Sequence, residues 1–290
     1  MISGKEKIPR SVISKHLCLS LSSNQLIVDL TAVKQNINLL RSKFKNQKRI
    51  MPIIKSQAYG TDSMIVGLFL ESCGIDILGV AYVSEALQLR KHGIQSSIFV
   101  LHASINELEE VINWDLEIAI SDEATLERLN TLAKEKERQV KVHLHVDTGM
   151  TRLGCPPNLA LSLARKIYFS SHIELTGLMT HFAQSEDKSG DGFTLEQAKS
   201  LENLHASLKT LNLHPHWIHA ENSAAAARFS FGTFNMIRTG LALFGLQSGS
   251  GLPLKPALSL MSKVNALHHC KQGDTVSYGR NYTVSSSHET

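Results

Sequence analysis

The chain has 290 residues, of which 42% are hydrophobic and 19% are charged, a composition typical of an ordinary globular protein with one large domain and part of a second. The net charge is +4 and the basic residues are scattered, which argues against nucleic-acid binding. No stretch approaches about 18 consecutive apolar residues, so we expect no membrane span. The cysteines form no CxxC pair, and we expect isolated thiols in a cytoplasmic protein; they are Cys18, Cys73, Cys155 and Cys270.

Residues 1–25 carry several basic side chains but no continuous apolar segment, so we expect a loose extension and not a signal peptide. A strand-like segment follows at Leu26–Leu30, and helical spacing continues over Thr31–Lys45. Short apolar runs then alternate with helical patterns, and eight of these runs are predicted core strands. They are Ile50–Lys55, Ile77–Tyr82, Ser97–Leu101, Leu116–Ile120, Val140–Asp147, Ile173–Thr180, His216–Ala220 and Asn235–Gly240.

Two helix starts are predicted between these strands. Ser84 precedes a helical run that Gly93 ends, and Thr194 with Gln197 forms a predicted capping box ahead of another helix. Eight strand–helix units in roughly 200 residues predict a closed (β/α)8 barrel of the TIM type. An open doubly wound sheet is the alternative, although no GxGxxG motif opens a helix. We expect the barrel over residues 26–255 and the beginning of a strand-rich domain over residues 256–290.

Lys55 directly follows the apolar run Met51–Ile54. Lysine is costly to bury, so a lysine at the end of a core strand often has a chemical role. A desolvated amine loses its proton more easily and can then form a Schiff base with a carbonyl group. The alternative is a lysine whose ammonium group reaches solvent at the strand end.

Other polar residues follow the same strand ends, where a barrel places its chemistry. Arg152 follows the fifth strand, His181 ends the sixth, Asn222 and Ser223 follow the seventh, and Arg238 lies in the eighth with Gly240. Small residues with free backbone N–H groups suit a phosphate. Asn222 and Ser223 are equally typical of a helix cap, and both roles are compatible.

Several segments resemble, in consistent order over about residues 26–290, the motifs of the alanine racemases. They are Ile54–Gly60 (IKSQAYG), Val146–Gly154 (VDTGMTRLG), Thr180–Ala183 (THFA), Asn222–Ala226 with Arg228–Phe229, Met236–Leu246 (MIRTGLALFGL) and Val276–Gly279 (VSYG). The resemblance implies a pyridoxal-phosphate enzyme with a barrel domain, a strand-rich domain and a homodimeric assembly. It implies alanine as substrate, with D-alanine used in cell-wall peptide synthesis.

The resemblance also implies two catalytic residues and a set of cofactor contacts. Lys55 would hold the cofactor covalently and act as one base, and Tyr278 would be the opposing base, reaching the partner subunit's cofactor. Racemisation needs a base on each face of a planar carbanion, which suits this pair. The implied cofactor contacts are Lys55, Tyr59, Arg152, His181, Asn222, Ser223, Arg238, Gly240 and Leu241, with the phosphate held by Tyr59, Ser223 and the backbone of Gly240 and Leu241.

Three of these roles concern charge. Arg238 would face the pyridine nitrogen and keep it unprotonated, with His219 as its hydrogen-bonding support. His181 would support Tyr278. Arg152 would contact the phenolic oxygen of the cofactor and the substrate carboxylate. Each residue alone also fits a structural role: a core histidine, a surface ion-pair partner for Arg152, or a strand tyrosine at position 278. No histidine pair has a recognisable metal-ligand spacing.

Two features depart from the family pattern. His145 stands where many members have a lysine, often carbamylated, that positions the arginine matched by Arg152, so we expect a weaker hold on Arg152. The strand-rich domain has barely begun at Thr290, so we expect an incomplete catalytic chamber. A truncated gene product, a fragment of a longer protein and a protein that has lost the racemase role all fit this pattern. The alternatives are therefore a racemase for another small amino acid and a non-catalytic barrel that binds or delivers pyridoxal phosphate.

Overall fold

The structure is a computed structural model that describes residues 23–45, 47–246, 251–286 and 288–289. It divides into two compact units. The first unit contains Val28–Leu258, and the second contains the described residues on either side, 23–27 and 259–289. Cys18 and most of the extension expected at residues 1–25 lie outside the described residues.

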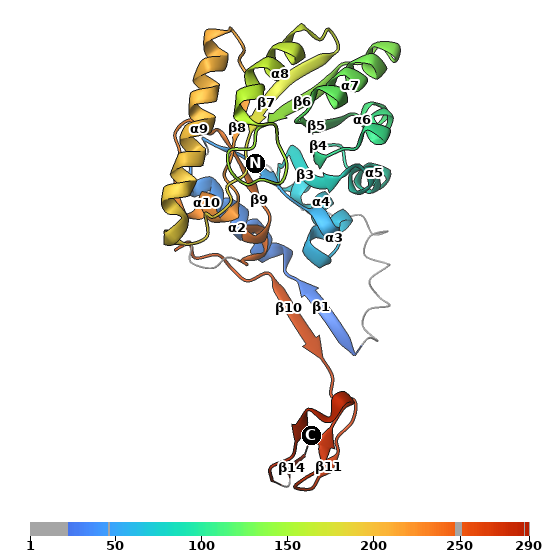
Figure 1. Cartoon of the computed structure of the whole chain (residues 1–290). Coiled ribbons are helices and arrows are strands. Elements are labelled where there is room, and N and C mark those ends of the chain that lie inside the picture. The colour runs from blue at the N-terminus through green and yellow to red at the C-terminus, as the bar shows by residue number, and fades with distance from the viewer. Residues whose placement is uncertain (1–22, 46, 247–250, 287, 290) are drawn as a thin grey trace, which may run out of the picture. The chain divides into compact units, whose positions relative to one another are not determined.

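The first unit is built on eight parallel strands in the described part of the chain (Figure 1). They are β2 (Arg49–Pro52), β3 (Ile77–Tyr82), β4 (Ser97–His102), β5 (Leu116–Ile120), β6 (Val140–His145), β7 (Ile173–Met179), β8 (Trp217–His219) and β9 (Met236–Thr239). Each of the eight predicted core strands corresponds to one of these, with ends that differ by at most three residues. The largest difference is at Lys55, which lies beyond the end of β2.

Backbone pairing closes these strands into a barrel. Strands β3 to β8 form one sheet in sequence order, and β2 pairs with β9. A parallel bridge between Ile53 and Gly79 joins β2 to β3. The N–H of Asn235 donates to the carbonyl of Ile218 at 3.1 Å, which links the approach to β9 with β8. The predicted (β/α)8 barrel is therefore confirmed, and the open sheet is excluded.

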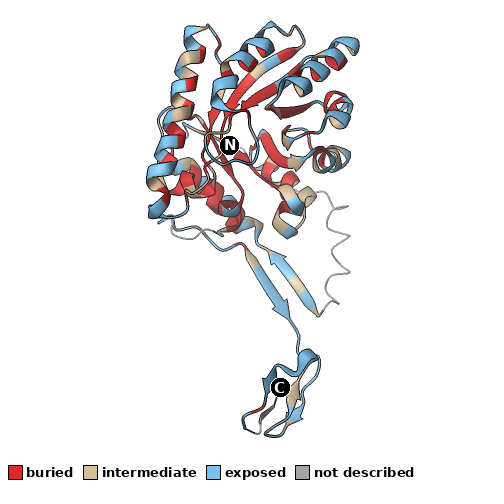
Figure 2. Cartoon of the chain, in the orientation of Figure 1, coloured by how far each residue is buried: buried red, intermediate tan, exposed pale blue. Residues whose placement is uncertain are grey.

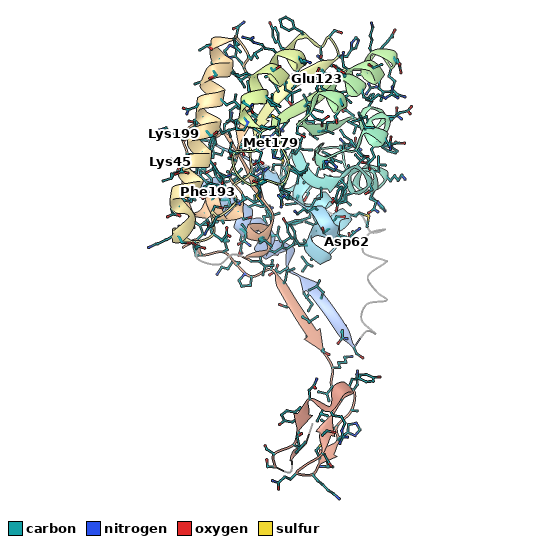
Figure 3. The ribbon with its side chains drawn as sticks, viewed as in Figure 1. Lys45, Asp62, Glu123, Met179, Phe193 and Lys199 are labelled. Atoms are coloured by element: carbon teal, nitrogen blue, oxygen red, sulfur yellow. The ribbon has the colours of Figure 1, made fainter. Side chains whose placement is uncertain are left out.

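The strands alternate between two cores, as the two-residue period of a β-strand requires. One set of buried side chains fills the barrel interior: Met51, Ile53, Ile77, Phe99, Met179 and Met236. Met179 is labelled in Figure 3. Their neighbours along the strands, such as Ile50, Leu78 and Ile98, belong to the larger core formed with the surrounding helices. Figure 2 shows the resulting continuous buried region along the strands.

Helices follow the strands and cover their outer face (Figure 1). They are α2 (Leu30–Lys43), α4 (Ser63–Ser72), α5 (Val83–Lys91), α6 (Leu108–Asn113), α7 (Glu123–Glu135), α8 (Pro157–Phe169), α9 (Asp191–Thr210) and α10 (Ser223–Arg228), with 3-10 turns η2 (Ile105–Glu107), η3 (Lys188–Gly190) and η4 (Leu241–Phe244). None of the helices in the described part of the chain has the length and apolar character that a membrane crossing requires.

Both predicted helix starts are wrong. Helix α5 begins at Val83, and the carboxylate of Glu85 accepts hydrogen bonds from the backbone N–H groups of Ala81 and Tyr82, so Ser84 is not its cap. Helix α9 begins at Asp191. Thr194 and Gln197 are buried inside it, because their side chains bind loop backbone and not the start of the helix.

The second unit contains short paired strands, of which two pairs are antiparallel. Strand β1 (Asn24–Val28) pairs with β10 (Leu258–Ser262) in a two-stranded sheet. The other strands are β11 (His269–Cys270), β12 (Thr275–Val276), β13 (Tyr282–Thr283) and β14 (His288–Glu289), with a 3-10 turn η5 (Tyr278–Arg280). Strand β11 pairs with β14 and β12 pairs with β13. Its C-terminal part is rich in strands, as expected, whereas residues 23–27, which were expected in the extension and the barrel, also belong to this unit.

Candidate active site

A cavity of about 410 Å³ opens at the carboxyl ends of the barrel strands. Apolar side chains and convergent polar groups line it together, as is typical of a ligand pocket. The lining residues are Ile53, Lys55, Tyr59, Leu101, His145, Arg152, Leu153, Met179, His181, Glu186, Asn222, Ser223, Ala224, Arg238, Gly240 and Leu241. The structure thus gathers all the predicted cofactor-contacting residues around one cavity.

Lys55 enters this cavity from an unusual turn. Residues Ser56 to Tyr59 all have positive φ, between 50° and 60°. The segment α3 (Lys55–Gly60) is therefore a left-handed helical turn, unlike an ordinary right-handed α-helix. Such a conformation costs about 1–2 kcal/mol per non-glycine residue. The carboxylate of Glu85 accepts a hydrogen bond from the N–H of Ser56 at 2.6 Å and helps to hold the turn. Backbone strain of this kind is concentrated at functional sites.

Lys55 and Arg152 are two cations at the same cavity. Neither side chain has a hydrogen-bond partner in the part of the chain that the structure describes. Among the described residues that line the cavity, one is acidic, Glu186. Two unpaired cations facing one cavity attract an anionic ligand. Sequence reasoning missed Glu186, which carried no strand-end signal because it lies five residues beyond His181.

Tyr59, Ser223 and Gly240 form a close-packed corner of the cavity. A Cβ atom at Gly240 would lie 1.8 Å from the Tyr59 hydroxyl, so only glycine leaves room for this tyrosine. The Ser223 hydroxyl accepts hydrogen bonds from the N–H groups of Gly240 at 3.1 Å and Ala242 at 3.2 Å. Burial raises the pKa of Tyr59, which keeps its hydroxyl available as a donor. Hydroxyls and N–H groups gathered around small residues suit a phosphate.

Asn222 is the N-cap of α10 and also lines the cavity. Its side-chain oxygen accepts a hydrogen bond from the N–H of Ala225 at 2.9 Å and another from the Ser185 hydroxyl at 2.9 Å. The helix-cap role expected for Asn222 is therefore present, at the wall of the cavity. The second bond joins α10 to the loop after β7.

Arg238 is buried inside the barrel, and both of its terminal nitrogens, Nη1 and Nη2, donate hydrogen bonds. Its guanidinium lies 2.7 Å from His219 Nδ1 and 2.9 Å from His181 Nδ1, and it donates to the carbonyl of Thr180 at 2.7 Å. Burial lowers the pKa of Arg238 to about 10, so it remains charged at neutral pH. Burial and this positive charge hold the pKa values of His181 and His219 well below their usual range. Both imidazoles are therefore neutral.

The hydrogen-bonded series continues into the barrel through residues that the sequence interpretation missed. His143 Nδ1 lies 2.8 Å from His219 Nε2, and His143 Nε2 lies 3.3 Å from the carboxylate of Glu117. Gly177 of β7 makes room for this ring, because a Cβ there would lie 2.5 Å from it. A usable signal was present, since His143 and His145 alternate along β6 and so share one face.

His145 lies beside Arg152 and Arg238 at the cavity wall. Burial and the charge of Arg238, together with that of Arg152, lower its pKa to about 4. The ring is therefore neutral at neutral pH and supplies no negative charge to Arg152.

Tyr278 belongs to the second unit, in η5, where its side chain is 99% exposed. Its role as the opposing base stays a prediction. The described residues contain no group of three or more His, Cys, Asp and Glu side chains placed to hold a metal ion.

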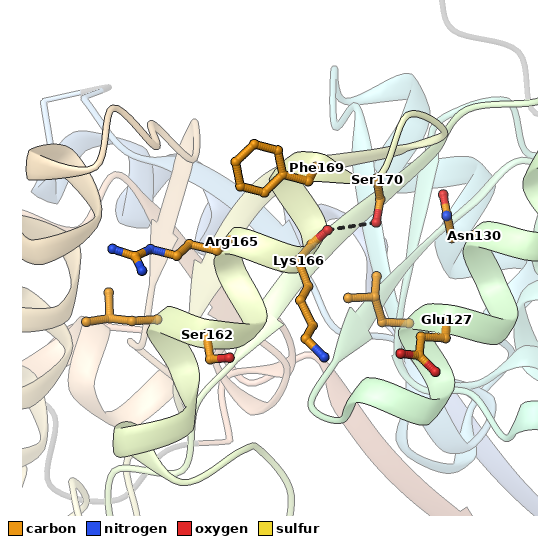
Figure 4. A pocket seen from close by; sticks show the side chains of 9 residues that line it. Glu127, Asn130, Ser162, Arg165, Lys166, Phe169 and Ser170 are labelled. Atoms are coloured by element: carbon orange, nitrogen blue, oxygen red, sulfur yellow. Dashed lines mark hydrogen bonds between the residues drawn. The ribbon is translucent and has the colours of Figure 1, made fainter.

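A larger hollow, of about 620 Å³, lies elsewhere, between α7 and α8 (Figure 4). Surface side chains line it, among them Glu127, Arg165 and Lys166, on helices at the outside of the barrel. Barrel enzymes place their chemistry at the carboxyl ends of the strands, so the smaller cavity is the candidate site.

Residues 28–248 match the family described as "Alanine racemase, N-terminal domain". An alanine racemase of Treponema denticola is 30% identical over 269 residues, covering 90% of this chain and 71% of the relative. One from Symbiobacterium thermophilum is 34% identical over 262 residues, covering 89% and 69%. Among solved structures, an alanine racemase from Streptomyces lavendulae superposes with a TM-score of 0.86 at 27% identity, covering 92% of this chain and 72% of that one.

Proposed function

The chain belongs to the alanine racemase family, and we propose that it interconverts L-alanine and D-alanine at the cavity around Lys55. Members of this family depend on pyridoxal phosphate. One observation carries the proposal: three chemically different features line the same cavity at the strand ends. They are the amine of Lys55, the buried guanidinium of Arg238, and the corner formed by Tyr59, Ser223 and Gly240. They suit the three functional parts of that cofactor, which are its carbonyl carbon, its pyridine nitrogen and its phosphate.

The residues fit the cofactor group by group. The corner formed by Tyr59, Ser223 and Gly240 would hold the phosphate, with the N–H of Leu241 beside it. Arg238 would face the pyridine nitrogen, because its guanidinium is buried and lines the cavity. Lys55 would bind the carbonyl carbon covalently through Nζ, which requires an amine that can give up its proton.

When bound, pyridoxal phosphate supplies a conjugated ring that draws electrons from the α-carbon of the amino acid and so makes its proton acidic. Lys55 would be released from the cofactor when the amino group of alanine takes its place. The freed amine of Lys55 and the phenol of Tyr278 would then serve as the two bases, one on each face of the α-carbon. One removes the proton and the other returns a proton from the opposite side, which inverts the configuration. A single base would return the proton mainly to the face from which it came.

Arg238 would limit how strongly electrons are withdrawn. A charged guanidinium can only donate hydrogen bonds, so it keeps the facing nitrogen unprotonated. The neutral rings of His181 and His219 hold this guanidinium in place by accepting from it. Weaker electron withdrawal favours reversible proton exchange over side reactions that need a longer-lived carbanion.

Arg152 would orient the amino-acid carboxylate and contact the cofactor's phenolic oxygen. Its guanidinium lines the cavity without a protein hydrogen-bond partner among the described residues. His145 is neutral and cannot fix it through charge. We therefore propose that Arg152 is held less firmly than it would be by an anionic neighbour, which raises the concentration of amino acid needed for saturation.

We further propose that the chain acts as a cytoplasmic homodimer in which Tyr278 enters the partner's site and D-alanine supplies cell-wall peptide synthesis. The exposure of the Tyr278 phenol supports a role toward another subunit, because an aromatic side chain that is 99% exposed buries no apolar surface within its own chain.

The test combines a binding measurement and a reaction on the purified chain. Pyridoxal phosphate is added, the absorbance of the lysine-bound cofactor is recorded, and α-proton exchange of L-alanine is followed in deuterated water with D-alanine as product. We expect both signals. Lys55→Ala should abolish the covalent cofactor signal, and Tyr278→Phe should impair proton exchange while sparing cofactor binding.

The possible outcomes separate the functions. Cofactor binding without exchange would show a non-catalytic pyridoxal-phosphate barrel. Exchange of L-serine or another small amino acid faster than L-alanine would show a racemase of different specificity. A folded chain with no cofactor signal would contradict the proposal.

A further inference from the structure

The amide of Gln197 is buried against two loops that carry predicted catalytic-site residues. Gln197 lies in α9 and is only 1% exposed. We define the His181 loop as residues 180–187 and the Arg152 loop as residues 146–156. Neither the motif resemblance nor the proposed roles give Gln197 a function.

This amide binds the backbone of the His181 loop through both of its polar atoms. Its Oε1 accepts a hydrogen bond from the N–H of Ala183 at 2.9 Å, and its Nε2 donates to the carbonyl of His181 at 3.1 Å. The orientation of the amide is fixed, because only the nitrogen can donate and only the oxygen can accept.

The second N–H of the same amide reaches the Arg152 loop. Gln197 Nε2 lies 3.3 Å from the Thr148 hydroxyl, and this hydroxyl lies 2.7 Å from that of Thr180. Since Thr148 accepts from the amide, its own proton is available for Thr180. Three of the four hydrogen-bonding positions of one side chain therefore connect two loops and a helix.

A neighbouring residue strengthens the same attachment. Thr194 is fully buried in α9 and its hydroxyl donates to the carbonyl of Gln184 at 2.9 Å. Helix α9 thus holds the backbone of the His181 loop at residues 181, 183 and 184. In the His181 loop, His181 Nδ1 accepts a hydrogen bond from the guanidinium of Arg238. In the Arg152 loop, Arg152 lies four residues beyond Thr148.

We propose that Gln197 is a positioning residue that holds the His181 loop and the Arg152 loop in one fixed arrangement. The inference rests on the proposed function of the cavity. Gln197 itself lies outside the cavity lining and touches neither the phosphate corner nor Lys55. Its loss should therefore affect the chemical step more than cofactor binding.

Two substitutions of matched length test this. Gln197→Met removes all three hydrogen bonds, and Gln197→Glu keeps an acceptor for Ala183 but removes both donors. The exposed amide Asn203 on the same helix provides the control, Asn203→Leu. Hydrogen exchange of residues 147–154 and 181–185 is measured by mass spectrometry, with α7 as the internal reference. Cofactor affinity is measured by absorbance, and kcat and KM are measured with L-alanine.

In Gln197→Met we expect exchange in both loops to accelerate at least about 10-fold while α7 stays unchanged. We expect kcat to fall about 10- to 100-fold, since small misplacement of reacting groups has effects of that size. Cofactor affinity should change less than about 3-fold, because the phosphate corner is untouched. In Gln197→Glu, exchange at Ala183 should be protected more than in Gln197→Met. Asn203→Leu should match wild type in every measurement.

Unchanged exchange in both loops of Gln197→Met would overturn the proposal. So would a parallel fall of cofactor affinity and kcat with loss of protection in α7, since that is general destabilisation. Failure of the proposed function is recognised separately, as absence of proton exchange in the wild-type chain. The loop-exchange and cofactor-affinity measurements still decide the positioning role in that case.

Discussion

Arg238 and His219 lie 2.7 Å apart, Nη1 to Nδ1, inside the barrel. Because arginine can only donate, His219 Nδ1 must accept, which places the ring proton on Nε2. That proton points at His143 Nδ1, 2.8 Å away, so the proton of His143 is on Nε2, facing the carboxylate of Glu117. One buried cation therefore sets the tautomers of two histidines and gives the series a single direction, from Arg238 to Glu117.

Arg238→Lys should be strongly destabilising although the charge is kept. Lysine lacks the planar fork that donates at once to His219 and to the carbonyl of Thr180, so buried acceptors would lose their partners. We expect the free energy of unfolding to fall by about 2–4 kcal/mol, measured by urea denaturation. Arg165→Lys, on the exposed face of α8, is the control and should change it by less than about 0.5 kcal/mol. Equal effects of the two substitutions would refute this account of Arg238.

Gly240→Ala should selectively weaken cofactor binding. The added Cβ would lie 1.8 Å from the Tyr59 hydroxyl, so Tyr59 must leave the phosphate corner. We expect the dissociation constant of pyridoxal phosphate, measured by absorbance titration, to rise at least about 10-fold. The matched control is Gly192→Ala in α9, where a Cβ meets nothing within 4 Å. Unaltered affinity in Gly240→Ala would show that the corner formed by Tyr59, Ser223 and Gly240 does not hold the phosphate.

The barrel is predictable from the sequence because eight short apolar runs alternate with helical patterns. Each run is apolar on both faces, because successive residues of a barrel strand enter two different cores. Ile50 and Met51, or Ile98 and Phe99, are neighbours that belong to different cores. In a barrel the carboxyl ends of the strands meet at one face, so the positions of Lys55 and Arg238 at strand ends predict that both line one cavity there, as they do.

What escaped prediction depends on long-range contacts. Glu117 and His143 are 26 residues apart in sequence, and nothing local shows that their side chains meet inside the barrel. Gln197 follows Thr194 at the spacing of a capping box, yet both side chains bind the loop after β7. The left-handed turn at Ser56–Tyr59 is also unpredictable from propensity, because none of its four residues is glycine.

This turn predicts an unusual response to glycine. Gln57 has a φ of 54°, where glycine is not strained, while Gln88 lies in the regular helix α5, where glycine costs about 1 kcal/mol. The two side chains are bonded to each other at 3.2 Å, so either substitution removes this contact. Gln57→Gly also removes the exposed hydrogen bond that the Gln57 amide accepts from the Ser63 hydroxyl, which works against the expected order. We expect Gln57→Gly to be at least about 1 kcal/mol more stable than Gln88→Gly in urea denaturation. The reverse order would rule out backbone strain at Gln57.

The buried histidines predict a loss of stability in mild acid. Burial and the charge of Arg238, aided by Arg152, lower the pKa of His145 to about 4, below the usual 6.5. Between these two pH values the unfolded chain binds a proton at His145 and the folded chain does not. The free energy of unfolding is therefore fully retained above pH 6.5, falls as the pH drops toward 4, and changes no further through this group below that pH.

The substitution His145→Gln isolates this contribution, because glutamine is polar and does not titrate. The difference between the two pKa values corresponds to roughly 3 kcal/mol. Urea denaturation of both proteins at about pH 7.5, 6, 5 and 4.5 measures it. We expect wild type to lose about 2–3 kcal/mol more than His145→Gln between the two ends of this range. His143, His181 and His219 remain in both proteins, so the shared loss cancels in the comparison. Parallel pH profiles would mean that His145 binds a proton in the folded chain as readily as in the unfolded one.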